Sequence, residues 1–124
     1  DFYMIRLPDI LLLKAEALVK KGDLIGAMGL VNQVRARVNL PPKTAADAVS
    51  ADNIIANERR LELAFEGHRW FDLVRTGKAV EVMNAQKDGS GNNLNYNIQP
   101  YRILMPIPQP QIDLNPLLTQ NPNY

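Results

Sequence analysis

Residues 58–75 read ERRLELAFEGHRWFDLVR and hold the densest run of charge in the chain. Within this stretch, three glutamates recur at every fourth position: Glu58, Glu62 and Glu66. A helix places such residues on one face, where like charges repel by about 0.2–0.5 kcal/mol per pair. We therefore expect positive side chains opposite them. The nearest arginines in the sequence are Arg59, Arg69 and Arg75.

Two interpretations of these glutamates remain open. Two carboxylates about 6 Å apart on a helix have a separation close to that of the catalytic pair of a retaining glycosidase. The alternative is an arginine–glutamate network that fixes the angle between this helix and a short helix after Gly67. We favour the network, because glycosidase carboxylates usually project from different elements into a sugar-sized cleft. Nearby arginines also favour the ionised form of every carboxylate, instead of dividing a pair into an acid and a base.

The aromatic residues of this block and of the loop beyond it are the candidates for ligand contact. Trp70 and Phe71 could form a platform for a sugar ring, but we favour packing of both rings into the core. Tyr96 and Tyr101 lie in and after a polar loop at 87–97, where amides and rings could hydrogen-bond a glycan. An ordinary solvated loop is the simpler interpretation of that segment.

The composition excludes several kinds of site. The 124 residues carry a net charge of +1, which argues against electrostatic binding of nucleic acid. Without cysteine, the chain can form neither a disulfide framework nor a thiolate nucleophile. Its one histidine, His68, excludes a multi-histidine metal site and argues against a catalytic triad. We expect no metal and no cofactor, and no apolar run reaches the ~20 residues of a membrane-spanning helix.

The chain before residue 40 is expected to form a helical hairpin. A first helix should run from about Pro8 to Lys21, because proline suits the first turn and Gly22 suits the left-handed position after the end. Asp9 adds negative charge at the positive end of the helix dipole. Such hairpins are the unit of tetratricopeptide-like arrays, although one hairpin does not establish an array.

The second helix of this hairpin should run from Leu24 to about Val38, with Asp23 as its N-cap. Its expected core stripe is Ala27, Val31, Val34 and Val38. Gly26 and Gly29 each cost about 1 kcal/mol relative to alanine inside a helix. We therefore expect another stretch of backbone to pass close to these two glycines.

The rest of the chain should contain shorter helices and then an irregular tail. After a linker at 41–50, helices are expected at about 52–66, 68–75 and 78–84. On the first of these, the expected core face consists of Ile54, Leu61 and Phe65. Six of the nine prolines follow Gln99, so the end of the chain should be irregular, with a short extended piece at 103–105.

Three stretches of the sequence resemble, in the same order, the motifs of the SusD/RagB family. They are 6–17 with Gly22-Asp23, then 58–75, and finally the ending with 105–109, 115–116 and 120–124. Residues 58–75 are similar to the most recognisable signature of that family. Asn123 departs from the glycine that is common there, although asparagine also tolerates the left-handed conformation.

This resemblance implies an all-α fold, in which a tetratricopeptide-like hairpin and further helices are followed by a proline-rich tail. It implies a non-catalytic lipoprotein on the extracellular face of the outer membrane of Bacteroidetes-type bacteria. Such proteins capture glycans, sometimes peptides, for import through a partner TonB-dependent transporter of the SusC type. Family members are several hundred residues long, so we expect this chain to be the C-terminal part of a longer protein, with the signal and lipid anchor upstream.

Within the chain we expect one domain over residues 1–124, made of a hairpin at 1–40, the signature helices at 51–84 and a loop and tail at 85–124. Ligand contacts in the family vary with the ligand and lie mostly elsewhere, so no binding residue is carried over. Trp70, Tyr96 and Tyr101 remain the candidates from the residues alone. The matched motifs should instead form a salt-bridge network that locks the last helices: Arg59, Glu62, Glu66, Arg69, Asp72 and Arg75.

Two other functions remain open at this point. A helical-repeat module that binds a protein or peptide would gain support from an exposed concave groove on the first two helices. A glycoside hydrolase would need at least two carboxylates that face an open cleft. Because most of the expected parent lies outside the chain, we also expect the first two helices to expose apolar surface, which would favour self-association of the piece.

Overall fold

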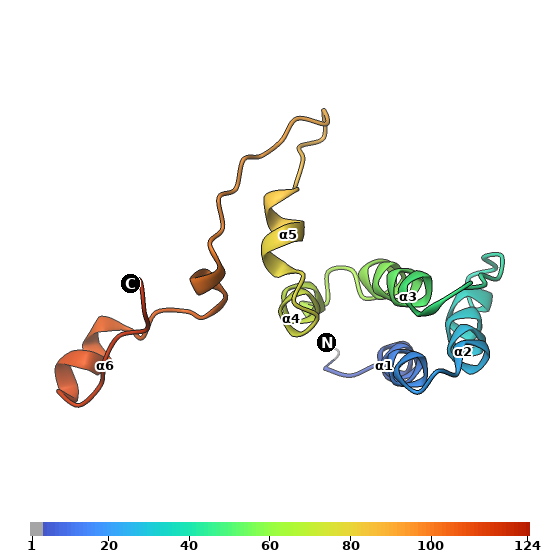
Figure 1. Cartoon of the computed structure of the whole chain (residues 1–124), viewed down its shortest axis with the longest axis horizontal. Helices are drawn as coiled ribbons and strands as arrows, with labels where there is room; N and C mark the ends of the chain where they lie inside the picture. Colours follow the sequence, from blue (N-terminus) through green and yellow to red (C-terminus); the bar gives the residue numbers. More distant parts are fainter. Residues whose placement is uncertain (1–3) are drawn as a thin grey trace. The chain divides into compact units, whose positions relative to one another are not determined.

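The structure, a computed structural model, describes residues 4–124 (Figure 1). Its elements are α1 (Leu7–Lys20), α2 (Leu24–Ala36), α3 (Ala48–Glu62), α4 (His68–Arg75), α5 (Ala79–Asn84), the 3-10 turn η1 (Pro100–Ile103) and α6 (Gln109–Leu114). In the part of the chain that the structure describes, extended pairing is confined to one antiparallel bridge between Lys87 and Asn93. The prediction of an all-α fold is therefore confirmed.

The chain divides into two compact units, of which the first ends at Arg69 and the second begins at Trp70. The first unit contains α1, α2 and α3, and the division falls within α4. The second unit contains α5, η1 and α6 with the segments that join them. The expectation of a single domain stays a prediction. Among the described residues, no helix combines the length and the apolar character that crossing a membrane requires.

The turn between α1 and α2 forms as the sequence predicts. Gly22 takes a φ of +84° after the end of α1, and its amide donates to the carbonyl of Val19 at 3.0 Å. The amide of Asp23 donates to the carbonyl of Leu18 at 3.0 Å, which completes a Schellman motif. The carboxylate of Asp23 then accepts from the amide of Gly26 at 2.8 Å and caps α2.

Two expectations for α2 are wrong. The helix ends at Ala36, so Val38 lies beyond it and is exposed, while the rest of the predicted stripe is buried. The glycines do not mark a close backbone within the described chain. A Cβ at Gly26 would meet the capping carboxylate of Asp23, and a Cβ at Gly29 would have no heavy atom within 4 Å.

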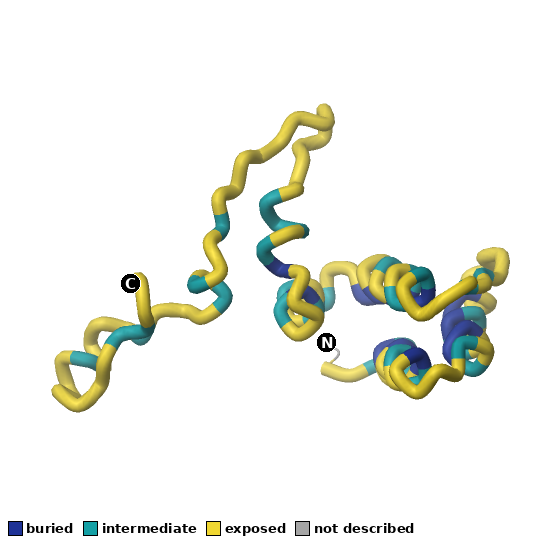
Figure 2. The backbone as a smooth tube through the Cα atoms, viewed as in Figure 1, coloured by how far each residue is buried: buried dark blue, intermediate teal, exposed yellow. Residues whose placement is uncertain are grey.

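The core of the first unit is built from one face of each of its three helices (Figure 2). Its buried members are Leu12, Ala15 and Val19 of α1, Ala27, Met28, Val31 and Val34 of α2, and Ala51 and Ile55 of α3. α1 packs against α2, and α3 packs against both helices of the hairpin. Each large side chain that is fully buried here stabilises the unit by about 1.5–3 kcal/mol.

α3 begins four residues earlier than expected, because Asp47 and Ser50 form a capping box. The amide of Ser50 donates to Asp47 Oδ1 at 2.7 Å, and the amide of Asp47 donates to Ser50 Oγ at 3.1 Å. The helix also ends four residues earlier, at Glu62. The predicted core face is consequently wrong: Ile54 is half-buried, and Leu61 and Phe65 are exposed.

In the second unit, short helices and side-chain hydrogen bonds organise a mostly exposed chain. α4 and α5 are joined by a turn at Gly77, and they bury Leu73 and Ala79. The polar loop predicted at 87–97 is exposed throughout. The tail differs from the prediction, because Ile103 ends a 3-10 turn and α6 forms where only irregular chain was expected.

Candidate functional site

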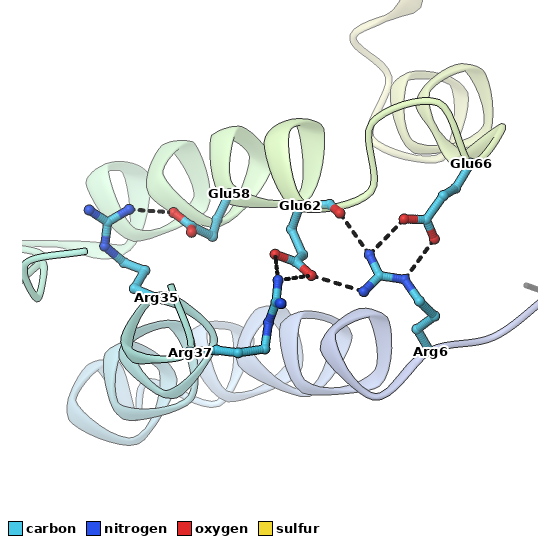
Figure 3. A network of polar contacts seen from close by, with 6 residues as sticks. All are labelled: Arg6, Arg35, Arg37, Glu58, Glu62 and Glu66. Carbon is cyan, nitrogen blue, oxygen red and sulfur yellow. Dashed lines mark hydrogen bonds and ion pairs between the residues drawn. The ribbon is translucent and has the colours of Figure 1, made fainter. Parts of the chain in front are cut away.

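The three glutamates of residues 58–75, called the signature block below, each bind an arginine. The first of these ion pairs is almost completely buried. Glu58 of α3 accepts a hydrogen bond from Arg35 Nη1 of α2 at 2.7 Å, and the two side chains are only 6% and 9% exposed (Figure 3). Arg35 Nε also donates to the carbonyl of Pro41 at 2.8 Å. This guanidinium therefore ties α2 to α3 and to the chain that leaves α2.

Glu62 and Glu66 share one guanidinium, that of Arg6, which precedes α1 (Figure 3). Arg6 Nη1 lies 3.0 Å from Glu62 Oε1, while its Nη2 and Nε donate to the two carboxylate oxygens of Glu66 at 2.6 and 2.8 Å. Arg6 Nη2 also donates to the backbone carbonyl of Glu62 at 2.7 Å, at the C-terminal end of α3. Glu62 additionally accepts from Arg37 Nη2 at 2.8 and 2.9 Å.

Arg59 of α3 contacts two acidic residues of α1. Its Nη1 lies 2.8 Å from Asp9 Oδ1 and 3.2 Å from the Asp9 carbonyl oxygen, and its Nε lies 3.8 Å from Glu16 Oε1. Arg59 and Asp9 are both buried. Asp9 lies in the first turn of α1, where its charge suits the helix dipole as expected, and it also forms this ion pair with α3.

The contact between Arg6 and Glu66 favours the charged form of both side chains. The hydrogen bonds from Arg6 hold the pKa of Glu66 below its ordinary value, with further contributions from the charges of Arg6 and His68. The same hydrogen bonds raise the pKa of the Arg6 guanidinium. A carboxyl group with a lowered pKa is a poor general acid at neutral pH, because it is ionised and has no proton to donate. In the described residues, no group of three or more histidine, cysteine, aspartate or glutamate side chains is placed to hold a metal ion.

The structure places some of the residues that were expected to form a salt-bridge network in ion pairs. Glu62 and Glu66 meet at Arg6, and Arg59 binds Asp9 on α1. Arg69 is exposed, while Asp72 and Arg75 form an ion pair of 2.8 Å within α4. The role of these residues in locking the last helices stays a prediction.

The principal partners were missed by sequence reasoning, namely Arg6, Arg35 and Arg37. They lie 23 to 60 residues from the glutamates that they bind. The signal in the sequence was the spacing of the glutamates. It predicts that positive side chains lie opposite them, but it does not indicate which residues supply those side chains.

The aromatic candidates lie in the second unit. Trp70 is half-buried, whereas Phe71 is 71% exposed, so its predicted packing into the core is wrong. Tyr96 is exposed on its loop. Tyr101 is half-buried, with the ring of Tyr124 edge-on at 5.3 Å and the guanidinium of Arg102 5.6 Å from its centroid.

A groove lies between α2 and the segment 43–45. It has a volume of about 400 Å³ and is lined by Leu24, Ile25, Met28, Gly29 and the segment 43–45. Asn32 also lines it and holds the segment in place, because its side chain donates to the carbonyl of Lys43 at 2.9 Å and accepts from the amide of Lys43 at 2.8 Å. The wall of the groove is thus fixed by two hydrogen bonds.

Known proteins are similar to this chain in sequence and in fold. The model of the SusD family matches residues 1–124. SusD-like protein P38 of Formosa agariphila is 43% identical over 133 residues, which cover 100% of this chain and 25% of that protein. A solved SusD-like protein from Bacteroides fragilis has 31% identity and a TM-score of 0.81, over 97% of this chain and 25% of that one.

A further similar structure is described as surface glycan-binding protein A from Bacteroides thetaiotaomicron. It has 32% identity and a TM-score of 0.79, over 99% of this chain and 25% of that chain. This chain spans about a quarter of the length of the curated relatives that it matches. The resemblance inferred from the hairpin, the signature block and the ending is therefore confirmed, and the chain belongs to the SusD family.

Proposed function

We propose that the protein containing this chain captures glycans at the outer face of the outer membrane and passes them to a TonB-dependent transporter for import. In this proposal it is a lipid-anchored, non-catalytic binding protein, and the 124 residues described above serve mainly as scaffold. Membership of the SusD family supports the proposal, as does the likeness to a surface glycan-binding protein.

One observation carries the scaffold role, which is the pairing of the signature carboxylates with arginines. Glu58, Glu62 and Glu66 each bind a guanidinium at 2.6–3.0 Å. A glycosidase pair needs one protonated and one ionised carboxyl group beside the sugar. The hydrogen bonds from Arg6 lower the pKa of Glu66, and the arginines hold α3 against the elements that precede it.

Affinity electrophoresis tests the proposal with the complete polypeptide that carries these 124 residues. The native protein is run through gels that contain a panel of polysaccharides. We expect at least one polysaccharide to retard it, without release of reducing sugar. No retardation by any polymer would contradict glycan capture, and release of sugar would contradict a non-catalytic role.

A variant with Trp70, Tyr96 and Tyr101 all replaced by alanine tests the scaffold assignment separately. We expect it to keep the retardation of the native protein, because the ligand contacts lie outside this chain. Leu117→Ala, at an exposed position of the tail, is the matched control. If the aromatic variant loses retardation while the control keeps it, the binding surface includes this chain and the scaffold assignment is wrong.

The groove on α2 favours a second function, which is the binding of a protein or peptide segment. Ile25 lines this groove and is one of the most exposed apolar residues of the first unit. Ile25→Asp would place a charge in an apolar wall without touching the core. If this variant keeps glycan retardation and loses co-purification of the transporter, the groove is a docking site of the scaffold.

A further inference from the structure

The turn between α3 and α4 holds a strained backbone. Phe65 has a φ of +66° and Gly67 a φ of +81°. Glycine adopts such angles without cost, but an aromatic residue meets a steric clash between its Cβ and the following carbonyl oxygen. Within the described residues the side chain of Phe65 is fully exposed, so packing inside this chain does not offset the strain. Something else must therefore hold the turn in this conformation.

The hydrogen bonds within the turn itself are long. The amide of Ala64 lies 3.4 Å from the carbonyl oxygen of Leu61, and the amide of Glu66 lies 3.3 Å from that of Leu63. Ordinary N–H···O bonds are near 2.9–3.0 Å, so these contribute little. Leu63 is buried and anchors only the beginning of the turn.

Arg6 binds Glu62 and Glu66, which lie on the two sides of the turn (Figure 3). On one side it binds the carboxylate and the backbone carbonyl of Glu62, at 3.0 and 2.7 Å. On the other side it binds both carboxylate oxygens of Glu66, at 2.6 and 2.8 Å. These four contacts to an ionised donor fix the separation between Glu62 and Glu66, and thereby the path of the residues between them.

We propose that Arg6 is a latch that holds the turn at 63–67 in its strained form, and that release of Arg6 lets the turn relax. The strain at Phe65 favours opening, and the four contacts of Arg6 oppose it. The latch is a conformational device of the scaffold, and it holds whether or not the protein binds a glycan.

The latch is more accessible than the two buried ion pairs that tie α3 to the hairpin. The side chains of Arg6 and Glu66 are 24% and 22% exposed, and solvent and salt therefore reach them. The Arg35–Glu58 and Arg59–Asp9 pairs are almost completely buried. We therefore expect the Arg6 contacts to open before these two buried pairs, while the helical core stays packed.

Limited proteolysis with chymotrypsin tests the latch in the complete polypeptide that carries this chain. Phe65 is an exposed chymotrypsin site, and cleavage after it requires local opening of the turn. Mass spectrometry measures the rate at which the fragment that begins at Glu66 appears. In Arg6→Ala we expect this rate to rise roughly 10- to 100-fold, as the loss of a charge-assisted hydrogen-bond set implies.

Arg37→Ala is the matched control, because it removes a contact to Glu62 and leaves both sides of the turn bound to Arg6. We expect its cleavage rate to stay within about twofold of the native rate. Equal rates in the native protein and in Arg6→Ala would overturn the proposal. So would an equal rise in Arg6→Ala and Arg37→Ala, because the turn would then respond to any loss of charge.

A second pair of variants tests the strain without altering Arg6. Phe65→Gly and Phe65→Ala both remove the ring, and they differ only in how well they tolerate a positive φ. We expect the glycine variant to have the higher unfolding midpoint. An alanine variant that is equally stable or more stable would show that the backbone at Phe65 is not strained.

If Arg6→Ala loses its helical circular dichroism signal, Arg6→Lys is used in the cleavage experiment instead. A cleavage rate in Arg6→Lys equal to the native rate would overturn the proposal.

Discussion

Arg35 Nη1 and Glu58 Oε2 lie 2.7 Å apart between α2 and α3, and their side chains are 9% and 6% exposed. Lys20 Nζ and Asp52 Oδ2 are separated by the same distance, between α1 and α3, but these side chains are 72% and 40% exposed. Equal distances therefore conceal different energetics. The buried pair is costly to break, because either partner alone would be an uncompensated charge in the core. The exposed pair is compensated by solvent.

Glu58→Gln should destabilise the first unit strongly. The substitution leaves the charge of Arg35 buried without its carboxylate, and the free energy of unfolding should fall by about 3–5 kcal/mol. Urea denaturation followed by circular dichroism measures this loss. Asp52→Asn is the matched control, for which we expect no measurable change. Similar losses in both variants would show that burial does not decide the strength of these pairs.

The two glycines of α2 should respond in opposite directions to alanine. Gly29→Ala should stabilise the protein by about 1 kcal/mol, because the new methyl group meets nothing within 4 Å and helix propensity improves. Gly26→Ala should destabilise it, because the Cβ collides with the carboxylate of Asp23 that caps the helix. Thermal melting of both variants measures the difference. A gain in stability for Gly26→Ala would contradict the cap geometry.

Asn32→Ala should loosen the segment that leaves α2. It removes two hydrogen bonds to Lys43, and each is worth about 0.5–1.5 kcal/mol. We expect faster hydrogen exchange at the Lys43 amide and a lower unfolding midpoint. Asn57→Ala, which removes a contact to the neighbouring Arg60 on the exposed side of α3, should leave both readouts unchanged. Unchanged exchange at Lys43 in Asn32→Ala would contradict this role.

Acid should weaken the contact between Arg6 and Glu66. Because the hydrogen bonds from Arg6 lower the pKa of Glu66 in the folded state, the ionised form stabilises the fold. This stabilisation is complete above the ordinary value of 4.5 and is lost as the pH falls through the lowered pKa. In Glu66→Gln, the unfolding midpoint should depend less on pH below 4.5 than in the native protein. Parallel pH profiles for the two proteins would show that Glu66 has no lowered pKa.

The local features of the hairpin could be predicted because neighbours in sequence produce them. Gly22 supplies the positive φ that ends α1, and Asp23 caps α2 with its own carboxylate. The stripe Ala27, Val31 and Val34 is buried because α2 keeps its helical period over those positions. These features depend on the conformational freedom of glycine and on the spacing of apolar and capping residues, and both can be identified in the amino-acid sequence.

The errors arose where the decisive contact was weakly signalled or distant. The start of α3 depends on a capping box in which Ser50 replaces the more usual glutamate or glutamine, and the segment was interpreted as a linker. α6 begins after Pro108 and contains Pro110 in its first turn, where proline is tolerated, although prolines predicted irregular chain. Both errors concern helix ends, where short-range signals compete.

The arginine partners lay beyond sequence reasoning for a different reason. Arg6 reaches Glu62 and Glu66 across 56 and 60 residues, and only the packing of α1 against α3 brings them together. The spacing of the glutamates predicts that positive side chains lie opposite them. Which arginines these are depends on the tertiary fold.

The most direct test of the account is the polysaccharide affinity of Glu62→Gln in the complete polypeptide, measured by gel retardation at a temperature where the variant is folded. Glu62 binds Arg6 and Arg37 and belongs to the signature block. If the block is a structural lock, the variant has a lower unfolding midpoint and the same retardation as the native protein. Loss of retardation with an unchanged midpoint would show that the block contacts the ligand, and would contradict the scaffold account.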